Sequence, residues 1–135
     1  MKAIADTGFI VAFVHSDDQF HRWALEVAAR LDAPLLTCEA VLAEAAFHLR
    51  SSPAVLQLLE AGMLRVAFNV AEHLDALRQL AERFADRSPD LADLCLIRMS
   101  ELHPRHVVVT VDEADFRVYR RNKRETIPLL SPPRG

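Results

Sequence analysis

The chain has 135 residues, of which 51% are hydrophobic and 26% charged, and this suits one globular domain that folds unaided. No apolar run reaches the roughly 18 residues of a membrane span, and no basic segment leads into an apolar stretch as in a signal peptide. The net charge of −3 combines an acidic body, where residues 1–116 hold 10 Lys and Arg against 18 Asp and Glu, with a basic end, where residues 117–135 hold 6 against 1. We therefore expect one cytoplasmic domain over residues 1–135, with no membrane attachment.

Short apolar runs alternate with segments of helical spacing along the chain. The expected elements are a strand at 2–6, a helix from 7 that stops near 15, a helix at 21–31, a strand at 34–37, helices at 38–49 and 53–61, a strand at 64–68, helices at 71–85 and 90–102, a strand at 107–109 and an edge strand at 126–130. This alternation favours an α/β domain with a mainly parallel sheet and helices on both faces. In such sheets, functional sites form at the carboxyl ends of the strands.

Helix ends carry the residues that usually cap them. Asp17 or Asp18 is placed to cap the helix at 21–31. Ser52 is placed to cap the helix at 53–61, with Pro53 at the first helical position, and Gly62 ends this helix. Cysteine and histidine residues show no metal-ligand spacing, so a zinc site is not expected.

Four acids fall where this sheet would bring them together. Asp6 follows the first strand and Asp112 follows HVVVT, so both should lie at the carboxyl edge of a parallel sheet. Glu44 and Asp93 lie on helices that should pack near the same edge. The four carboxylates therefore predict one acidic pocket.

Each acid also has a simpler structural explanation. Asp6, Asp90 and Asp112 could each cap a helix, and Glu44 could pair with His48 one turn later. For one acid this would be the better interpretation. For all four it is not, because an α/β sheet does not need four carboxylates at one edge.

Carboxylates brought together repel one another, so they either keep protons or hold a cation. Oxygen ligands alone suit Mg²⁺, or Mn²⁺ in its place. Such an ion lowers the pKa of a bound water and stabilises negative charge at phosphorus. The acid pattern therefore indicates phosphodiester hydrolysis.

The order of four segments, ADTGFIVAF, AVLAEAAFHL, DLADLCLIRMSE and VVVTVDEADF, resembles the PIN domain, and specifically the VapC-type toxins of bacterial toxin–antitoxin pairs. The resemblance covers nearly the whole chain. It implies an α/β/α sandwich and an Mg²⁺- or Mn²⁺-dependent endoribonuclease. It also implies an RNA substrate, a small VapB-type antitoxin as partner, and a homodimer.

Carried over residue by residue, the resemblance makes Asp6, Glu44, Asp93 and Asp112 the catalytic acids. Asp6, Asp93 and Asp112 would hold the metal, and Glu44 would bind a second ion or orient the attacking water. Secondary candidates are Thr7 beside the pocket, Asp90 as an alternative to Asp93, Asp115 as an alternative to Asp112, and Glu39 as an alternative to Glu44. The sequence departs from the family at Gly8, where Ser is common.

The segment RVYRRNKR, residues 117–124, could supply the positive charge that an acidic pocket needs to hold RNA. The candidate RNA contacts are Arg117, Arg120, Arg121, Lys123 and Arg124. Tyr119 could stack on a base or pack into the core, and the whole segment could equally be a solvated basic face.

Two further functions stay open from sequence. The chain could be a PIN-like module that only binds protein, although the presence of all four acids counts against this. It could also be a housekeeping PIN nuclease with no antitoxin.

Overall fold

The computed structural model describes residues 1–133. Its strands are β1 (Ala3–Ala5), β2 (Leu35–Thr37), β3 (Leu64–Val66), β4 (Val107–Val109), β5 (Arg120–Arg121), β6 (Glu125–Thr126) and β7 (Leu129–Leu130). Five of them form one parallel sheet in the order β3-β2-β1-β4-β7, while β5 and β6 form a separate antiparallel hairpin. The fully apolar β1 lies at the centre of the sheet, where both of its faces are buried.

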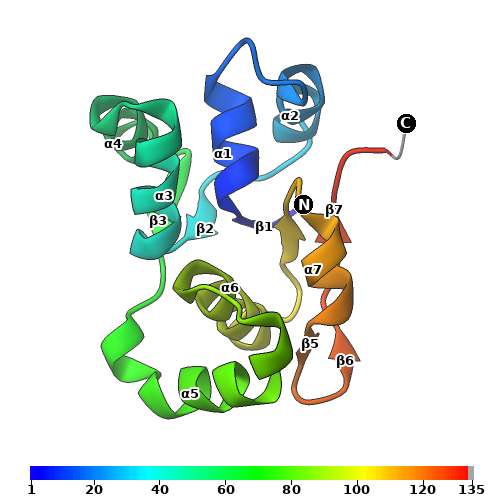
Figure 1. Cartoon of the computed structure of the whole chain (residues 1–135). Helices are drawn as coiled ribbons and strands as arrows, with labels where there is room; N and C mark the ends of the chain where they lie inside the picture. Colours follow the sequence, from blue (N-terminus) through cyan, green and yellow to red (C-terminus); the bar gives the residue numbers. More distant parts are fainter. Residues whose placement is uncertain (134–135) are drawn as a thin grey trace.

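Helices cover both faces of the sheet (Figure 1). They are α1 (Thr7–Val14), α2 (His21–Ala28), α3 (Glu39–Leu49), α4 (Ser52–Glu60), α5 (Leu74–Arg83), α6 (Leu91–Leu102) and α7 (Glu113–Val118), with short 3₁₀ turns η1 (Val70–Glu72) and η2 (Ala85–Arg87). Helices α1 to α4 pack together on one face, and α5 and α6 pack together on the other. The expected α/β/α sandwich is confirmed.

Helix α6 is the most buried of the described helices and packs against β1 and β4. Its run from Leu94 to Ile97 is buried on every side, as expected for a helix that is apolar around its circumference. Cys95 on this helix and Cys38 before α3 are both buried and free, which suits packing residues of the core. Among residues 1–133, no helix is long and apolar enough to cross a membrane.

Two helix caps differ from the prediction by small shifts. The N-cap of α4 is Ser51 rather than Ser52, and its hydroxyl accepts a hydrogen bond from the Ala54 amide at 3.1 Å. Asp18 does not cap α2, because the N-cap residue is Phe20 and the Asp18 carboxylate accepts a hydrogen bond from the amide of this residue at 2.8 Å. Gly62 follows the last turn of α4 with φ of +76°, so it ends this helix as predicted.

The second half of the chain differs more from the prediction. The expected helix at 71–85 is divided into η1 and α5 at His73, whose ring stacks on Phe68 at 4.7 Å. The expected edge strand at 126–130 is shorter, since only Leu129 and Leu130 pair with β4. Thr126 instead joins the β5–β6 hairpin, which the sequence pattern did not predict.

Candidate functional site: an acidic edge of the sheet

Asp6 lies directly after β1, at the carboxyl edge of the sheet, and is 7% exposed. Both oxygens of its carboxylate accept hydrogen bonds at 2.6 Å, Oδ1 from the Thr7 amide and Oδ2 from the Thr110 hydroxyl. The first of these bonds caps α1. Asp6 therefore acts as a helix cap, and its buried position also fixes the direction of the carboxylate at the sheet edge.

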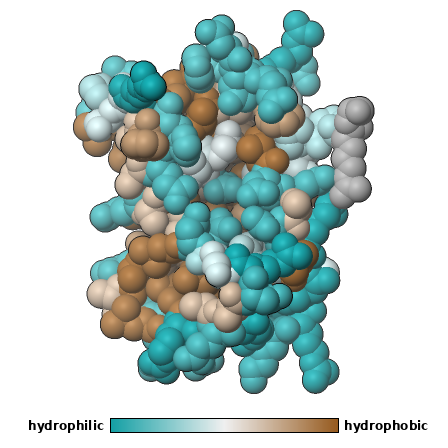
Figure 2. All heavy atoms as spheres, in the orientation of Figure 1, coloured by the Kyte–Doolittle hydropathy of each residue, from teal (hydrophilic) through white to brown (hydrophobic). Residues whose placement is uncertain are grey.

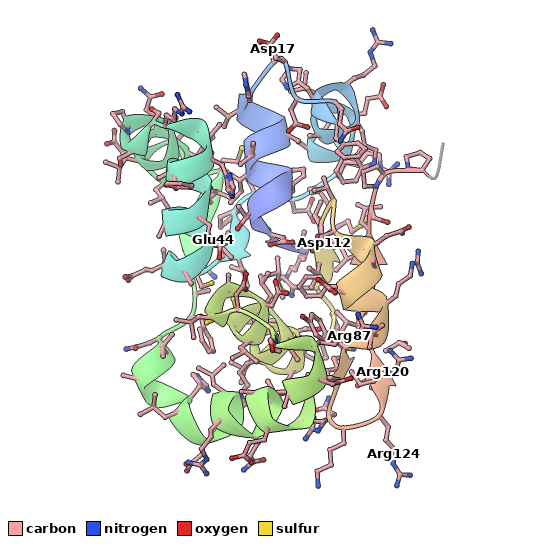
Figure 3. The ribbon with its side chains drawn as sticks, in the orientation of Figure 1. Asp17, Glu44, Arg87, Asp112, Arg120 and Arg124 are labelled. Atoms are coloured by element: carbon pink, nitrogen blue, oxygen red, sulfur yellow. The ribbon has the colours of Figure 1, made fainter. Side chains whose placement is uncertain are left out.

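The other three expected acids lie around the same edge. Glu44, on α3, accepts a hydrogen bond from the Thr7 hydroxyl at 3.3 Å. Asp112 follows β4, and its amide donates to the Thr110 hydroxyl at 3.0 Å, so Thr110 contacts both Asp6 and Asp112. Figure 3 shows Glu44 and Asp112 on either side of the first turn of α1, and Figure 2 shows hydrophilic side chains gathered across this part of the face.

Asp93 lies in the first turn of α6, and its Oδ2 accepts a hydrogen bond from the Tyr119 hydroxyl at 3.0 Å. Asp90 caps the same helix by accepting from the Asp93 amide at 2.8 Å. The two neighbouring acids thus differ in what they contact. Asp90 stabilises the helix end, whereas the carboxylate of Asp93 is directed by a phenol from another element.

Burial and neighbouring acids raise the pKa values of Asp6, Asp93 and Asp112. Burial raises the pKa of Asp6 to about 6, and the charges of Asp112 and Glu44 add to this effect against the two hydrogen bonds. Burial, with the charges of Asp90 and Asp6, raises the pKa of Asp93 to about 7. Burial and Asp115 also raise the pKa of Asp112. Carboxylates that resist ionisation together form a site of negative potential that a cation would relieve.

The chemistry of these donors fits a hard divalent cation, because only carboxylate and hydroxyl oxygens are present. As the side chains are placed, no three Asp, Glu, His or Cys residues within residues 1–133 are close enough to bind one ion together. The acids therefore share an electrostatic field and would have to draw closer to share an ion.

The PIN domain family model matches residues 3–122, which includes every element from β1 to β5. The chain belongs to the PIN domain family. PIN domains are generally nucleases that act on nucleic acid and use divalent metal ions, so the acidic edge of this PIN domain is where such chemistry is expected. A comparison with curated proteins finds no match.

The remaining secondary candidates have other contacts in this PIN domain. Asp115, in the first turn of α7, forms an ion pair with Arg87 at 3.3 Å. Glu39 is exposed in the first turn of α3, where a negative charge favours the helix N-terminus. Thr7 stays a member of the site through its bond to Glu44.

The basic segment divides into exposed and internally bonded arginines. Arg117 forms an ion pair with Glu113 at 2.9 Å. The Arg120 guanidinium donates hydrogen bonds to nearby backbone carbonyls, and the shortest of these bonds, to the Arg117 carbonyl oxygen, measures 2.7 Å. Lys123 and Arg124 are exposed between β5 and β6, and Figure 3 shows Arg124 at the tip of this hairpin. These four residues stay candidates for RNA contact.

Arg121 does not fit that expectation. Its side chain is 4% exposed, and its guanidinium donates to the Ser100 oxygens, the Pro104 carbonyl and the Glu125 carboxylate at 2.9 to 3.2 Å. These bonds attach the hairpin to the end of α6. The arginine therefore has a structural use in this conformation.

Two residues outside the expected set contact the acids. Thr110 is not among the residues predicted from sequence, although a threonine directly after an apolar strand that precedes Asp112 is the available signal. For Tyr119, where base stacking and core packing are both open from sequence, the structure shows core packing, because the residue is buried and its ring packs edge-on against Phe84 and Phe116. The apolar residue three positions earlier, Phe116, is consistent with this core position.

Proposed function

We propose that this PIN domain is an Mg²⁺-dependent endoribonuclease that hydrolyses RNA phosphodiester bonds at Asp6, Glu44, Asp93 and Asp112. The observation that carries the proposal is the shared field of the acids at the carboxyl edge of the sheet, where the pKa of Asp6 is about 6 and that of Asp93 about 7. Ionised carboxylates in such a place cost stability unless a cation compensates them.

The side chains divide the work. Asp6, Asp93 and Asp112 would hold Mg²⁺ or Mn²⁺, and Glu44 would hold a second ion or orient the attacking water. Thr110 keeps Asp6 aimed at the edge, and Thr7 does the same for Glu44. When bound, the ion supplies Lewis-acid activation of water and stabilises charge at phosphorus. We expect products with 5′-phosphate and 3′-hydroxyl ends.

We further propose that the protein is the toxin of a VapBC-type pair, acting in the cytoplasm, with a VapB-type antitoxin and a second copy of the chain as partners. Exposed apolar side chains support a protein-binding role for the α3–α4 face. Phe47 is 78% exposed and Leu56 54% exposed, on α3 and α4 respectively. Large apolar groups on a surface often mark protein contacts.

Cleavage of total RNA tests the catalytic proposal. We expect cutting with Mg²⁺, loss with EDTA, and a decrease of about 100-fold or more for Asp6→Asn and Asp93→Asn, since each removes a charge that would hold the metal. Asp86→Asn, which changes an exposed acid on η2, is the matched control and should cut normally. Full activity in both pocket variants would refute the mechanism, and absence of cutting on any RNA would favour the binding module.

Antitoxin pairing needs a separate experiment. Expression of the wild-type chain should arrest growth, and a small DNA-binding protein encoded just upstream should reverse the arrest and co-purify with the chain. Cleavage without growth arrest or such a partner would indicate a housekeeping nuclease instead.

A further inference from the structure

A group of basic side chains lies at the edge of the sheet opposite to the acids. Lys2 precedes β1, and residues 103–106 form the loop that precedes β4. The Val107 amide donates to the Lys2 carbonyl at 3.1 Å, so the loop and the N-terminal segment are joined. Because β1 and β4 are parallel neighbours, their amino ends meet at this edge and their carboxyl ends meet at the acidic one.

The loop and Lys2 line a cavity of about 430 Å³ that is open to solvent, a volume in the range of small-ligand sites. Its lining is Lys2, Leu102, His103, Pro104, Arg105 and His106. The rings of the two histidines lie with their centroids 5.1 Å apart. The cavity therefore combines basic groups with an apolar wall.

Positive charge dominates around this cavity. Burial and the charge of Arg65, on β3, lower the pKa of His103. Burial, His103, Lys2 and Arg65 lower the pKa of His106. Within the described residues, the side chains of Lys2, Arg65 and Arg105 take part in no hydrogen bond or ion pair. Lys2 and Arg105 therefore line the cavity without compensating contacts, and the charge of Arg65 acts on both histidines from β3.

One acid that interacts with this group is Asp32, because the charge of Lys2 helps to lower its pKa. The carboxylate of Asp32 is already paired with the N-terminal ammonium at 2.9 Å. It therefore does not neutralise the arginines. An anion bound from solution would neutralise them. A phosphate group suits three nearby cations and two imidazole donors better than a single carboxylate does.

The apolar wall narrows the class of ligand. Leu102 and Pro104 offer contact area to a sugar or base, and a histidine ring can stack on a base. Inorganic phosphate would bind the cations but make no contact with Leu102 and Pro104. A nucleotide would contact both the cations and these apolar side chains.

We propose that the basic pocket lined by Lys2, His103, Arg105 and His106, with the charge of Arg65 close by on β3, binds the phosphate of a nucleotide, supplied by an RNA strand or by a free nucleotide. The RNA source rests on the proposed ribonuclease function, whereas phosphate binding does not. As the pocket lies across the sheet from the acids, a strand bound there would be held by a part of the molecule that does not cut it.

Binding of a fluorescent 12-nucleotide single-stranded RNA in EDTA tests the pocket without cleavage. The double variant Arg65→Glu/Arg105→Glu should weaken binding about tenfold or more, and should lower the salt dependence of log K by about 1.4 for two lost phosphate contacts. Arg22→Glu/Arg30→Glu makes the same charge change at exposed positions on and after α2, and should bind within about twofold of wild type. Equal losses in both variants, or no loss in either, would overturn the inference.

Further measurements test whether the variants stay folded and which ligand the pocket binds. Arg65 and Arg105 are exposed, so the thermal midpoint of their variant should match that of the control pair. NMR signals of the His103 and His106 rings should move on adding RNA or AMP, and binding of AMP as tight as that of RNA assigns the pocket to free nucleotides. Unmoved signals with RNA, AMP and inorganic phosphate alike would contradict phosphate binding.

Failure of this inference can be told from failure of the proposed function. Wild-type chain that cuts RNA with Mg²⁺ while the Arg65/Arg105 variant binds RNA normally would overturn the basic pocket alone. If wild type binds RNA but cuts none, and the Arg65/Arg105 variant no longer binds RNA, the basic pocket is supported and the nuclease function is rejected.

Discussion

The Tyr119 hydroxyl donates a hydrogen bond to Oδ2 of Asp93 at 3.0 Å, and this bond joins the end of α7 to the first turn of α6. Tyr119 is 1% exposed, and its ring lies edge-on to Phe84 and Phe116. A donor held this firmly fixes one rotamer of the carboxylate. The direction of Asp93 is therefore set by the core and not by the solvent.

Tyr119→Phe should change the acid–base behaviour of Asp93 more than the fold. The hydrogen bond lowers the pKa of Asp93 against burial and the neighbouring charges, so its loss should raise this pKa further above about 7. If RNA cleavage needs the ionised carboxylate, the acid limb of the pH–rate profile should move to higher pH. Activity near pH 7 should fall about tenfold and recover in part near pH 9.

Phe84→Leu is the control for this substitution, because it removes a ring that packs on Tyr119 and leaves the hydroxyl in place. It should cost roughly 1–2 kcal/mol of unfolding free energy by lost packing and leave the pH profile unmoved. Should Tyr119→Phe behave in the same way, Tyr119 would be a packing residue only. The carboxyl ¹³C shift of Asp93 reports its pKa independently of activity.

Metal-free protein should become less stable as pH rises from about 4 to about 7. Asp6 and Asp93 have raised pKa values in the folded chain, so the unfolded chain releases their protons first and the native state binds more protons in this range. The unfolding free energy must then fall with rising pH and level off above the folded pKa values. For the buried Asp6 the loss is on the order of 3 kcal/mol.

Urea denaturation of Asp6→Asn across the same range isolates this contribution. The variant cannot ionise, so its stability relative to wild type should increase between pH 4 and pH 6. Asp86→Asn should run parallel to wild type. Mg²⁺ at neutral pH should stabilise wild type and not Asp6→Asn, since only bound ligand shifts the folding equilibrium. A wild-type curve that rises with pH would contradict the raised pKa of Asp6.

Arg121→Ala should destabilise the fold by about 2–4 kcal/mol, because four hydrogen bonds of a buried guanidinium are lost and the Ser100 and Pro104 carbonyls are left without it. Arg124→Ala, at the exposed hairpin tip, should change stability by less than about 0.5 kcal/mol. Thermal unfolding of the two variants measures the difference. Similar midpoints would mean that Arg121 does not attach the hairpin to α6.

The sequence pattern was sufficient to predict elements whose structure depends on local residue spacing. The helix expected at 90–102 is observed at Leu91–Leu102, and Asp6 lies at the end of an apolar strand as expected. Both inferences need only local spacing. The sheet geometry groups the four acids, the family resemblance supports the same set, and the structure adds that Asp6, Asp93 and Asp112 have raised pKa values.

Features that depend on distant residues were not predicted. The Thr110 hydroxyl meets Asp6 across 104 positions of sequence, so no local pattern announces it. The β5–β6 hairpin turns through Asn122 and Lys123 at positive φ, without the glycine that usually marks such a turn, and it is held by buried Arg121. The basic pocket was missed for the same reason, because Lys2 and residues 103–106 come together only at the sheet edge.

Gly8, the position that departs from the family, is explained by a neighbour that sequence could not reveal. A Cβ at this position would overlap Cγ2 of Val111, the residue between Thr110 and Asp112. Gly8→Ala should therefore destabilise wild type by about 1–3 kcal/mol through overpacking. In a Val111→Ala background the overlap is gone, and the same change should stabilise the chain by up to about 1 kcal/mol, because alanine favours the helical backbone of α1.

This reversal of sign is measured as a coupling free energy from urea denaturation of the four proteins in the cycle. Gly62→Ala serves as the comparison, because Gly62 has φ of +76° and nothing within 4 Å of its added Cβ. It should destabilise by backbone strain alone, equally with and without Val111→Ala. A coupling near zero for Gly8 as well would mean that Val111 moves aside without cost. Glycine at position 8 would then need another cause.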